Sequence, residues 1–411
     1  MSSELADCTL GNFVRLQRGH DLTASEQRPG SVPVMGSAGP NGTHSEAKAR
    51  GPGVVIGRSG ASMGRVHFSE VDYWPHNTCL YVTDFFGNNP RFAYYLLQTL
   101  DLAAFNSGSA QPSLNRNFIY SMPLRVPARH EQDCIVELLR ALDNRIALLR
   151  ETNATLEAIA QALFKSWFVD FDPVRAKMEG CVPEGMDEAT TALFPDGFED
   201  SELGLVPRGW QIGKLGELAR QHKGSINPLK NPETLFEHFS LPAFDKHQMP
   251  VSELGEEIKS NKTSVPPDAV LLSKLNPHIP RVWLPVDVGR HAVCSTEFLV
   301  FVPASSASKE FIYCAFSTPK FQELLCQLVT GTSNSHQRVK PDGVSSMNFV
   351  IPGSRVLEAF AVLVKPIFER IGHNRGEAQT LATLRDTLLP RLISGHLRLP
   401  EAESLLEEAC A

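Results

Sequence analysis

A heptad of apolar residues runs through residues 131–168, a stretch that contains no proline or glycine. One series of seam positions recurs every seven residues and a second series lies three residues ahead of it, at Leu142, Leu149, Leu156 and Leu163 and at Leu139, Ile146, Asn153 and Ala160. This spacing predicts the contact face of a coiled-coil helix. At about 1.5 Å per residue the helix would be over ~50 Å long. A helix of that length predicts a spacer between two globular regions.

The same seam recurs at an offset of 225 residues, the distance from Leu142 to Ile367. The two series of the second copy are Ile367, Asn374, Leu381 and Leu388, and Val364, Ile371, Ala378 and Arg385. Two copies of one seam predict two long helices that pack against each other as an antiparallel coiled coil.

The register of this coiled coil follows from aligning the two seams. Placing Asn153 opposite Asn374 gives apolar pairs in most other layers, while Leu142 faces Arg385, whose guanidinium would have to reach water. A buried Asn pair lowers stability but selects register and orientation. We therefore assign Asn153 and Asn374 to the register of the coiled coil. The alternative is that both are exposed helix residues.

The globular regions before each helix are also related. Leu10-Gly11 resembles Leu215-Gly216 at an offset of 205, Pro52 resembles Pro267 at 215, and Gly108 resembles Gly331 at 223. An offset that increases slowly toward 225 is expected of a duplicated unit with small loop insertions. The chain therefore consists of two copies of one plan, a globular region followed by a long helix.

Each globular region mixes strand and helix signals. Short β-type runs alternate with Gly and Pro turns, and an amphipathic helix precedes a polar loop and a last strand that ends in proline. In the first copy these segments are 51–68, 77–86, 90–105, 108–115 and 118–127, and in the second 269–284, 295–303, 309–328, 331–340 and 346–352. The pattern predicts α+β domains rather than a doubly wound sheet.

Length, composition and cysteine content narrow the possible classes of protein. With 411 residues, 42% hydrophobic and 21% charged, the chain has room for two or three domains. No apolar run approaches the ~20 residues of a membrane span, and the N-terminus lacks the features of a signal peptide, so we expect a cytoplasmic protein. The eight cysteines contain no CxxC pair and are expected to be reduced thiols, without a metal site.

The net charge of −7 argues at first against a polyanionic partner. Most of the acidity, however, lies in residues 131–204, which hold 6 Lys and Arg against 16 Asp and Glu. Residues 1–130 hold 11 basic against 9 acidic residues, and residues 205–353 hold 15 against 13. Both globular regions are therefore mildly basic, which permits nucleic-acid binding without predicting it.

Three stretches carry a family resemblance, LEAIAQALFKSWFVDFDPVRAKMEG (156–180), LFPDGFEDSELGLVPRGW (193–210) and LLPRLISGHLRL (388–399). With the duplicated plan and the GSAQPSLN loop (108–115), they make the chain similar to the specificity subunits of type I restriction-modification enzymes over essentially its whole length. The second copy departs from the pattern in its loop, TGTSNSHQRVKPDG, and at Pro366, which should kink the second helix or mark its effective start.

The resemblance implies a fold and a function. It implies two α+β target recognition domains related by a pseudo-twofold axis and separated by an antiparallel two-helix coiled coil. Each domain would read one half of a bipartite target in double-stranded DNA, and the helices would set the separation of the halves. The chain itself would have no catalytic activity.

The resemblance also implies partners and their cofactors. Two methyltransferase subunits, which use S-adenosylmethionine, would dock on the shared regions, and two motor-nuclease subunits, which use ATP and Mg²⁺, could join them. The chain would bind no cofactor and would work in the cytoplasm of a bacterium or archaeon. The expected divisions are two recognition domains at 1–130 and 205–353, spacer helices at 131–173 and 354–395, an acidic linker at 174–204 and a C-terminal tail at 396–411.

Candidate DNA contacts are Arg, Lys, Asn, Gln, Ser and His side chains on loops that could enter a groove. In the first domain they are Arg58, Ser59, Arg65, Ser107, Ser109, Gln111 and Asn115. Repeat correspondence gives Lys274, Asn276, His278, Arg281, Thr332, Ser333, Asn334, His336, Gln337, Arg338 and Lys340 in the second. The alternative for any single residue is a solvated loop side chain that caps a turn.

A run of aromatic residues near the end of the first helix is the candidate partner-binding surface. Phe164, Trp167, Phe168 and Phe171 cannot all be covered by a two-helix seam, so some should pack on a domain or on another subunit. Packing within this chain is the open alternative. The acidic linker could likewise be only a solvated connector.

Two other classes of protein are alternatives. A fused restriction-modification enzyme would need its own chemistry, but Asn88-Asn89-Pro90-Arg91 lacks the second proline and the aromatic residue of an adenine methyltransferase motif, and there is no Walker A loop. A coiled-coil scaffold that binds only protein would explain the helices but not two duplicated, mildly basic, loop-rich domains.

Overall fold

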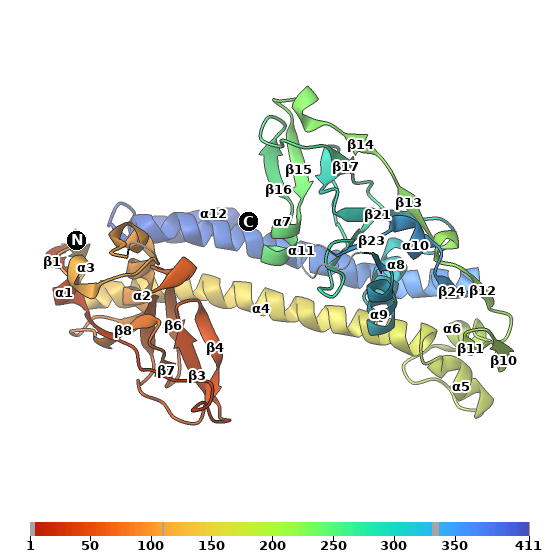
Figure 1. Cartoon of the computed structure of the whole chain (residues 1–411), viewed down its shortest axis with the longest axis horizontal. Coiled ribbons are helices and arrows are strands. Elements are labelled where there is room, and N and C mark those ends of the chain that lie inside the picture. Colours follow the sequence, from red (N-terminus) through yellow and green to blue (C-terminus); the bar gives the residue numbers. More distant parts are fainter. Residues whose placement is uncertain (1–4, 109–110, 331–336, 411) are drawn as a thin grey trace. The chain divides into compact units, whose positions relative to one another are not determined.

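The computed structural model describes residues 5–108, 111–330 and 337–410. It forms two compact units, Met1–Ala147 with Ala378–Ala411, and Leu148–Glu377. Two long helices, α4 (Arg129–Phe168) and α11 (Ser354–Ile393), contribute to both units (Figure 1). Each is 40 residues long, so the predicted spacer helices are confirmed as elements.

The ends of the long helices differ from the expected ones. The first helix stops at Phe168 instead of residue 173, because Phe171 has a left-handed backbone (φ 58°) and α5 (Asp172–Met178) begins after it. The second helix begins at Ser354, so Pro366 does not mark its effective start; that Pro366 kinks the helix stays a prediction. Proline removes one helical hydrogen bond, but the side chains of Val364 and Phe368 beside it are buried, and tertiary packing of this kind outweighs the local loss.

The first unit contains a four-stranded antiparallel sheet in the order β2-β8-β5-β6 and a three-stranded sheet in the order β4-β3-β7. Helix α2 (Pro90–Thr99) packs on β5 and β6. The strands are β2 (Arg15–Arg18), β3 (Val32–Gly36), β4 (Gly39–His44), β5 (Gly53–Gly57), β6 (Val66–Ser69), β7 (Trp74–Pro75) and β8 (Cys79–Asp84). Short helices α1 (Leu10–Phe13) and α3 (Arg116–Ile119) flank them.

The second unit repeats this plan. Its four-stranded sheet has the order β13-β21-β18-β19, which matches β2-β8-β5-β6 strand for strand. In the first unit β1 (Ala6–Thr9) pairs with β9 (Pro123–Val126), and in the second β12 (Gln211–Lys214) pairs in the same way with β24 (Asn348–Ile351). The two registers, Ala6 with Val126 and Gln211 with Ile351, reproduce the sequence offsets of 205 and 225. The predicted duplication and the α+β class are therefore confirmed.

The second copy is larger than the first. Its second sheet has five strands in the order β14-β17-β20-β15-β16, where the first copy has three. The strands of this unit are β13 (Ala219–His222), β14 (Ser225–Ile226), β15 (Leu235–Phe239), β16 (Val251–Leu254), β17 (Lys262–Ser264), β18 (Val270–Ser273), β19 (Val282–Trp283), β20 (Ala292–Cys294), β21 (Phe298–Pro303), β22 (Val329–Thr330) and β23 (Arg338–Val339). Its helices include α7 (Leu241–His247), α8 (Lys309–Phe316), α9 (Pro319–Gln327) and α10 (Pro341–Ser345).

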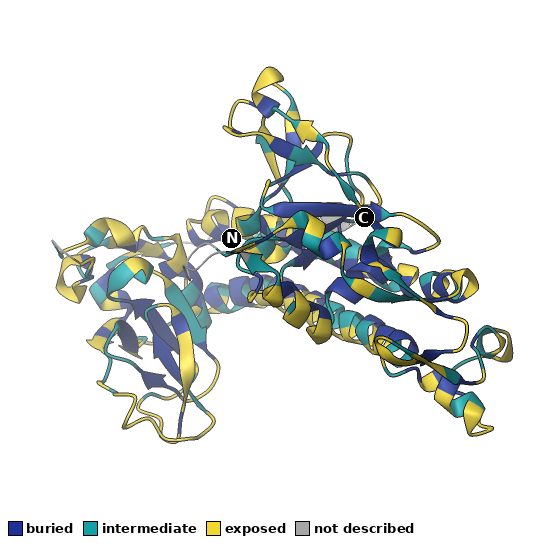
Figure 2. Cartoon of the chain, turned by 45° about the vertical axis from the view of Figure 1, so that its right-hand side comes forward, coloured by how far each residue is buried: buried dark blue, intermediate teal, exposed yellow. Residues whose placement is uncertain are grey.

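Each unit has its own hydrophobic core. The largest cluster belongs to the second unit and joins residues of α4, α11, α8 and the four-stranded sheet. In the first unit, a smaller cluster around Met35, Val55 and Tyr73 lies between its two sheets. Figure 2 shows buried residues concentrated in the strands and exposed residues on the loops and outer helix faces.

The expected acidic linker is a folded part of the second unit. It contains α5, α6 (Glu188–Ala192) and a hairpin of β10 (Phe198–Ser201) with β11 (Gly204–Pro207). Val174 and Phe194 are buried in the core, and Lys177 Nζ donates to the Phe194 carbonyl oxygen at 2.6 Å. The C-terminal segment, expected as a tail, contains helix α12 (Leu399–Cys410).

Candidate nucleic-acid interface

Three segments of the first unit meet at the end of β5 and form what we call the first junction: residues 57–60, 76–79 and 111–115. The Arg58 backbone N–H donates to the Thr78 carbonyl oxygen at 2.9 Å, and the Arg58 carbonyl accepts from the Leu114 N–H at 2.8 Å. A β-bridge joins Ser59 to Ser113. Residues 112–114 of the polar loop are therefore attached through their backbone to the candidate residues that follow β5.

A cavity of about 340 Å³ opens at the first junction. Of the predicted residues, Arg58, Ser107 and Asn115 line it together. The guanidinium of Arg58 donates to the Asn77 carbonyl oxygen at 3.3 Å, and Asn115 caps α3 by accepting from the Asn117 N–H. The structure thus brings three sequence-predicted residues to one concave surface.

Two arginines that sequence reasoning missed line the same cavity, Arg18 and Arg116. Arg18 is the last residue of β2 and pairs with Asp21 at 3.2 Å, while Arg116 Nη1 donates to the Leu16 carbonyl oxygen at 2.8 Å. Arg116 directly follows Asn115, so its position next to the polar loop could have identified it as a candidate DNA contact. Arg18 reaches the cavity only because β2 pairs with β8, which no local pattern indicates.

The remaining predicted residues of the first domain are more dispersed. Ser59 lies in the junction, where its N–H contacts Ser37 Oγ. Arg65 is exposed on the turn before β6 and does not line the cavity, whereas exposed Gln111 lies beside Gly60. Ser109 falls outside the described residues.

Glycine is required at the end of β5 by close packing. A Cβ atom at Gly57 would lie 2.1 Å from the Ser62 carbonyl oxygen and 2.7 Å from the Ser37 carbonyl oxygen, both of them backbone atoms. A larger residue would push the turn apart. The glycine pattern of residues 51–68 therefore holds the junction together.

The second unit contains the same junction with different side chains. The Lys274 N–H donates to the Glu297 carbonyl oxygen at 2.9 Å, and the Lys274 carbonyl accepts from the Val339 N–H at 3.0 Å. A β-bridge joins Leu275 to Arg338. Lys274 therefore occupies the place of Arg58, and we call residues 273–281, 295–298 and 337–340 the second junction.

Predicted residues of the second domain gather at this junction. The Asn276 N–H donates to the Gln337 carbonyl oxygen at 2.9 Å, and His278 and Lys340 are exposed. Asn276 has a left-handed backbone (φ 50°), and its Oδ1 is buried without a hydrogen-bond partner among the described residues. The remaining predicted residues, Thr332, Ser333, Asn334 and His336, fall outside the described part of the chain.

Both candidate arginines of the second domain form two-pronged ion pairs. Arg281 Nε and Nη2 donate to the two carboxylate oxygens of Asp245, at 2.6 and 2.8 Å. Arg338 Nε and Nη2 donate to the Glu297 carboxylate, at 3.0 and 2.9 Å. The two arginines differ in access, because the Arg281 side chain is 13% exposed and that of Arg338 is 46% exposed.

The proposed register residues lie in one layer of the second unit. Asn374 Nδ2 donates to Asn153 Oδ1 at 2.8 Å, and Asn153 Nδ2 donates to the Ile371 carbonyl oxygen at 3.3 Å. Asn374 is 1% exposed, which removes the alternative that both residues are solvated. The α4 and α11 segments run antiparallel here, since Phe164, further along α4, packs against Phe360, earlier in α11. That the Asn pair selects the register remains a prediction.

The sequence suggested that the Arg385 guanidinium reaches water, but in the structure it forms ion pairs. Its Nη1 donates to Asp143 Oδ1 at 2.7 Å, and its Nη2 donates to Asp386 Oδ1 at 2.7 Å. The Tyr95 hydroxyl donates to the other oxygen of Asp143 at 2.6 Å, which connects α2 to the helix pair within the first unit. The guanidinium is therefore held by two carboxylates, those of Asp143 and Asp386.

The proposed partner-binding surface is wrong in the form predicted. Phe164, Trp167, Phe168 and Phe171 are all buried in the core of the second unit. The Phe164 ring lies 5.3 Å from that of Phe311 and 5.9 Å from that of Phe360, centroid to centroid. The alternative of packing within the chain therefore holds, because the folded linker and the second domain cover the aromatic run.

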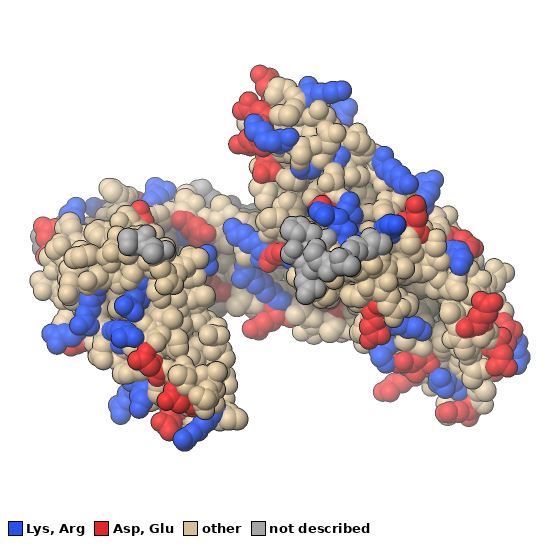
Figure 3. All heavy atoms as spheres, in the orientation of Figure 1, with Lys and Arg blue, Asp and Glu red and all other residues tan. Residues whose placement is uncertain are grey.

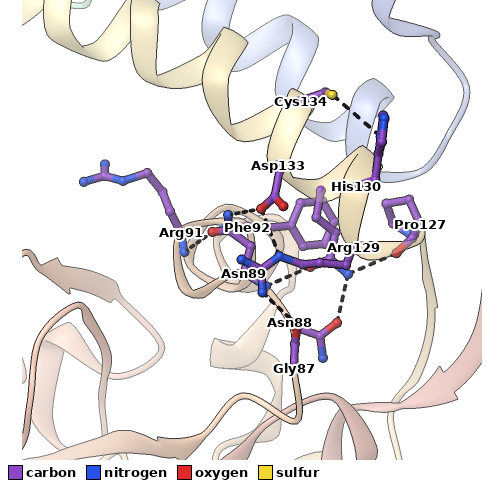
Figure 4. Close-up of polar contacts among 11 residues, drawn as sticks. Gly87, Asn88, Asn89, Arg91, Phe92, Pro127, Arg129, His130, Asp133 and Cys134 are labelled. Atoms are coloured by element: carbon purple, nitrogen blue, oxygen red, sulfur yellow. Dashed lines mark hydrogen bonds and ion pairs between the residues drawn. The ribbon is translucent and has the colours of Figure 1, made fainter.

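A buried polar network attaches the loop before α2 to the start of α4 (Figure 4). Gln132 is 1% exposed, and its Oε1 accepts from the Asn89 N–H at 2.9 Å. Its Nε2 donates to Asn88 Oδ1 at 2.8 Å and to the Pro127 carbonyl oxygen at 3.0 Å. Asn88 and Asn89 belong to the segment Asn88-Asn89-Pro90-Arg91, which lacks a complete methyltransferase motif, and their side chains take part in this packing.

Asn89 has two further contacts in this network. Its Oδ1 caps α2 by accepting from the Arg91 and Phe92 N–H groups, and its Nδ2 donates to Asp133 Oδ1 at 2.6 Å. The hydrogen bond from Asn89 and that from Arg129, at 2.9 Å, lower the pKa of Asp133. Figure 4 shows Asp133 between Asn89 and Arg129, so the first domain is anchored on α4 by charge-assisted hydrogen bonds.

The surface charge is uneven. Figure 3 shows Lys and Arg gathered on the first unit over the region that Figure 1 labels β8, whereas basic and acidic side chains are mixed on the second unit. Among the described residues, no helix combines the length and apolar composition of a membrane span, and no three His, Cys, Asp or Glu side chains gather as a metal site would require.

The chain is built from two copies of one α+β domain, each followed by a long helix and each with a polar junction. Residues 8–158 match the family model described as a type I restriction modification DNA specificity domain. The chain is 27% identical over 357 residues to the type I restriction enzyme HindI specificity subunit of Haemophilus influenzae, covering 75% of this chain and 77% of that one. It is 25% identical over 335 residues to the MjaIX specificity subunit of Methanocaldococcus jannaschii, covering 76% and 70%.

A solved structure shares the fold. The type I restriction-modification S subunit from M. genitalium matches with a TM-score of 0.56 at 14% identity, over 95% of this chain and 99% of that one. The chain is therefore similar to the specificity subunits of type I restriction-modification enzymes, and the family's DNA specificity domain is matched over residues 8–158.

Proposed function

We propose that each junction is the DNA-reading surface of its domain, so that the chain reads a bipartite target in double-stranded DNA. One observation carries the proposal: the same three-segment backbone arrangement occurs twice, with Arg58 in one copy and Lys274 in the other at the same place. Around these residues lie Arg, Asn, Gln and Ser side chains, which are the groups that hydrogen bond to phosphates and base edges.

The long helices supply the spacing in this proposal. A helix rises about 1.5 Å per residue, so two paired 40-residue helices define a fixed length that loops could not hold. The Asn153–Asn374 hydrogen bond opposes sliding of one helix along the other, because a shifted register would bury unpaired amides.

The chemistry belongs to other subunits. We assign methylation of adenine to two methyltransferase subunits with S-adenosylmethionine, and cleavage to two motor-nuclease subunits with ATP and Mg²⁺. This chain contributes recognition and no catalytic group. The buried aromatic run leaves their docking surface to other residues of the helices and domains.

The test is methylome sequencing of a methylation-free host that expresses the chain with its cognate methyltransferase subunit, beside the methyltransferase subunit alone. We expect methylated adenine in one split motif only when the chain is present. Exchange of residues 1–125 for those of a relative should change one half of the motif. A soluble complex that methylates no motif would instead favour a protein-binding scaffold.

Arginine substitutions test the first junction directly. If the arginine binds phosphate, Arg58→Ala and Arg116→Ala should each make the slope of log K against log salt concentration shallower, by the contribution of about one phosphate contact. If it reads a base, the substitution should relax the first half of the motif. Arg65→Ala is the matched control, because Arg65 is exposed in the same domain but lies outside the cavity.

A further inference from the structure

A cationic residue stands at the end of the edge strand of the four-stranded sheet in each unit. In the first unit Arg18 is the last residue of β2 and lines the cavity of the first junction. In the second unit Lys223 directly follows β13 and is exposed. Lys223 is not among the DNA contacts predicted from the sequence. The strand registers decide whether the two residues also share a place in the fold.

The register of the first sheet fixes where Arg18 lies relative to the first junction. Arg18 pairs with Leu80 of β8. Leu80 follows Thr78 by two residues, and the Thr78 carbonyl oxygen accepts from the Arg58 N–H at 2.9 Å. Arg18 therefore lies on the strand next to β8, opposite the second residue after the carbonyl that binds Arg58.

The second sheet gives Lys223 the same position. The Glu297 carbonyl oxygen accepts the matching hydrogen bond of the second junction, and the second residue after it is Leu299 of β21. β13 pairs with β21 and ends with His222 opposite Val300. Continuing this register by one residue places Lys223 opposite Leu299, as Arg18 lies opposite Leu80.

The sequence offset between the two copies agrees with the registers. Arg18-Gly19 and Lys223-Gly224 are 205 residues apart. The same offset relates β1 to β12, the strands that precede β2 and β13 in the two copies. Offset and strand pairing therefore assign Arg18 and Lys223 to one position of the duplicated domain.

Both cations can accept a ligand. Among the residues that the structure describes, the side chains of Lys223 and Lys274 form no hydrogen bond and no ion pair. Arg18 is paired with Asp21, but these side chains are 55% and 72% exposed. An ion pair so exposed contributes little free energy, so a phosphate group can compete for the guanidinium.

Equal charge at an equivalent position favours a ligand group that both halves of the target share. The phosphate backbone is common to every DNA sequence, whereas base edges differ. A lysine ammonium is a compact point charge, suited to phosphate and without the fork of donors that reads a base in two places. Other positions of the junctions differ in charge between the copies, as Thr78 and Glu297 do.

We propose that Arg18 and Lys223 are equivalent phosphate-binding residues, one in each domain, and that each holds a backbone phosphate of its half of the target. The inference rests on the proposed function of the two junctions. The end of the edge strand then supplies affinity, and base recognition is left to other residues of the junctions.

The experiment compares the wild-type complex of the chain and its methyltransferase subunit with Lys223→Ala, Lys223→Gln, Lys223→Arg, Arg18→Ala and Lys320→Ala complexes. Each complex is assayed for its methylated motif, for its unfolding midpoint, and for binding to a cognate duplex and to a duplex without the motif at several salt concentrations. Lys320→Ala is the matched control, because Lys320 is an exposed lysine of the same unit on α9, outside the second junction.

Lys223→Ala and Lys223→Gln should weaken binding to both duplexes by one common factor, with a slope of log K against log salt concentration shallower by about 0.9. Counted down from ~1 M salt, this slope corresponds to roughly 5-fold weaker binding at ~0.15 M. Arg18→Ala should show the same change, whereas Lys223→Arg and Lys320→Ala should bind as wild type does. The methylated motif and the unfolding midpoint should stay the same in every complex.

The double variant Arg18→Ala, Lys223→Ala tests the equivalence of the two positions. Its slope should be shallower by about 1.8, because the two cations neutralise phosphates in separate halves of the target and their effects add. Its methylated motif should again be that of wild type.

Two results would overturn the inference. One is a Lys223→Ala complex whose affinity and salt slope match those of wild type and of Lys320→Ala. The other is a Lys223→Ala complex whose motif is relaxed in its second half, because Lys223 would then read a base. Failure of the proposed function looks different, since the wild-type complex itself would then methylate no split motif.

Discussion

Phe164→Ala should destabilise the second unit severely. The Phe164 side chain is 2% exposed, and its ring centroid lies 5.2 Å from that of Phe168 and 5.3 Å from that of Phe311. Truncating a buried phenylalanine costs about 3–5 kcal/mol, since it removes apolar contacts and leaves a cavity. In a unit of this size each kcal/mol lowers the unfolding midpoint by about 2–4 °C, so a decrease of roughly 6–20 °C is expected.

The assay is thermal unfolding of the full chain, monitored by calorimetry and by circular dichroism. Ile159→Ala is the matched control, because Ile159 lies on the same helix but is 45% exposed, and its truncation should change the midpoint little. Phe164→Leu should fall between wild type and Phe164→Ala, because it retains part of the buried volume.

A different result would restore the idea that this aromatic run binds a partner. If Phe164→Ala unfolds at the wild-type temperature but no longer co-purifies with the methyltransferase subunit, the side chain belongs to an interface. The reasoning from burial within the chain would then be refuted.

Three further predictions concern buried polar groups. Asn374→Leu alone should lower stability by about 1–3 kcal/mol because it leaves the Asn153 amide partly unpaired, whereas the double Asn153→Leu, Asn374→Leu variant should be at least as stable as wild type, both measured by thermal unfolding. Gln132→Leu should lower stability by a similar ~1–3 kcal/mol in urea unfolding, because the groups it pairs lose their partner. Burial lowers the pKa of His238 despite its hydrogen bond with Glu253, so protonation favours the unfolded state. Stability should be full above pH 6.5 and decrease as the pH falls toward the lower folded pKa, and His238→Gln should flatten this part of a pH series of unfolding midpoints.

The long helices and the duplication could be predicted because their signals are local and repeated. The spacing of Leu139, Leu142 and Ile146 predicts a coiled-coil seam, and all three side chains are buried. The correspondence of Arg58 with Lys274 could also be predicted from the sequence, because small loop insertions preserve the order of turns. At Pro366 one of the two local alternatives was wrong, because the helix begins twelve residues earlier, at Ser354.

The side-chain environment of the candidate sites could not be predicted. Arg18 enters the first junction through strand pairing, and Asp245 and Glu297 reach Arg281 and Arg338 from other segments of the chain. Nothing in the residues adjacent to those arginines indicates that a carboxylate holds them.

The sequence by itself determined the two long helices, the duplicated α+β plan and the loops that carry the candidate DNA contacts, because periodicity and turn chemistry act over neighbouring residues. Only the tertiary structure decided which side chains are accessible and which are paired. It buried the aromatic run, folded the acidic linker as part of the second unit, placed Arg18, Arg58 and Arg116 at one cavity, and paired Arg338 with Glu297. Burial and charge pairing depend on contacts between segments far apart in the chain, and these contacts exist only after the strands have paired.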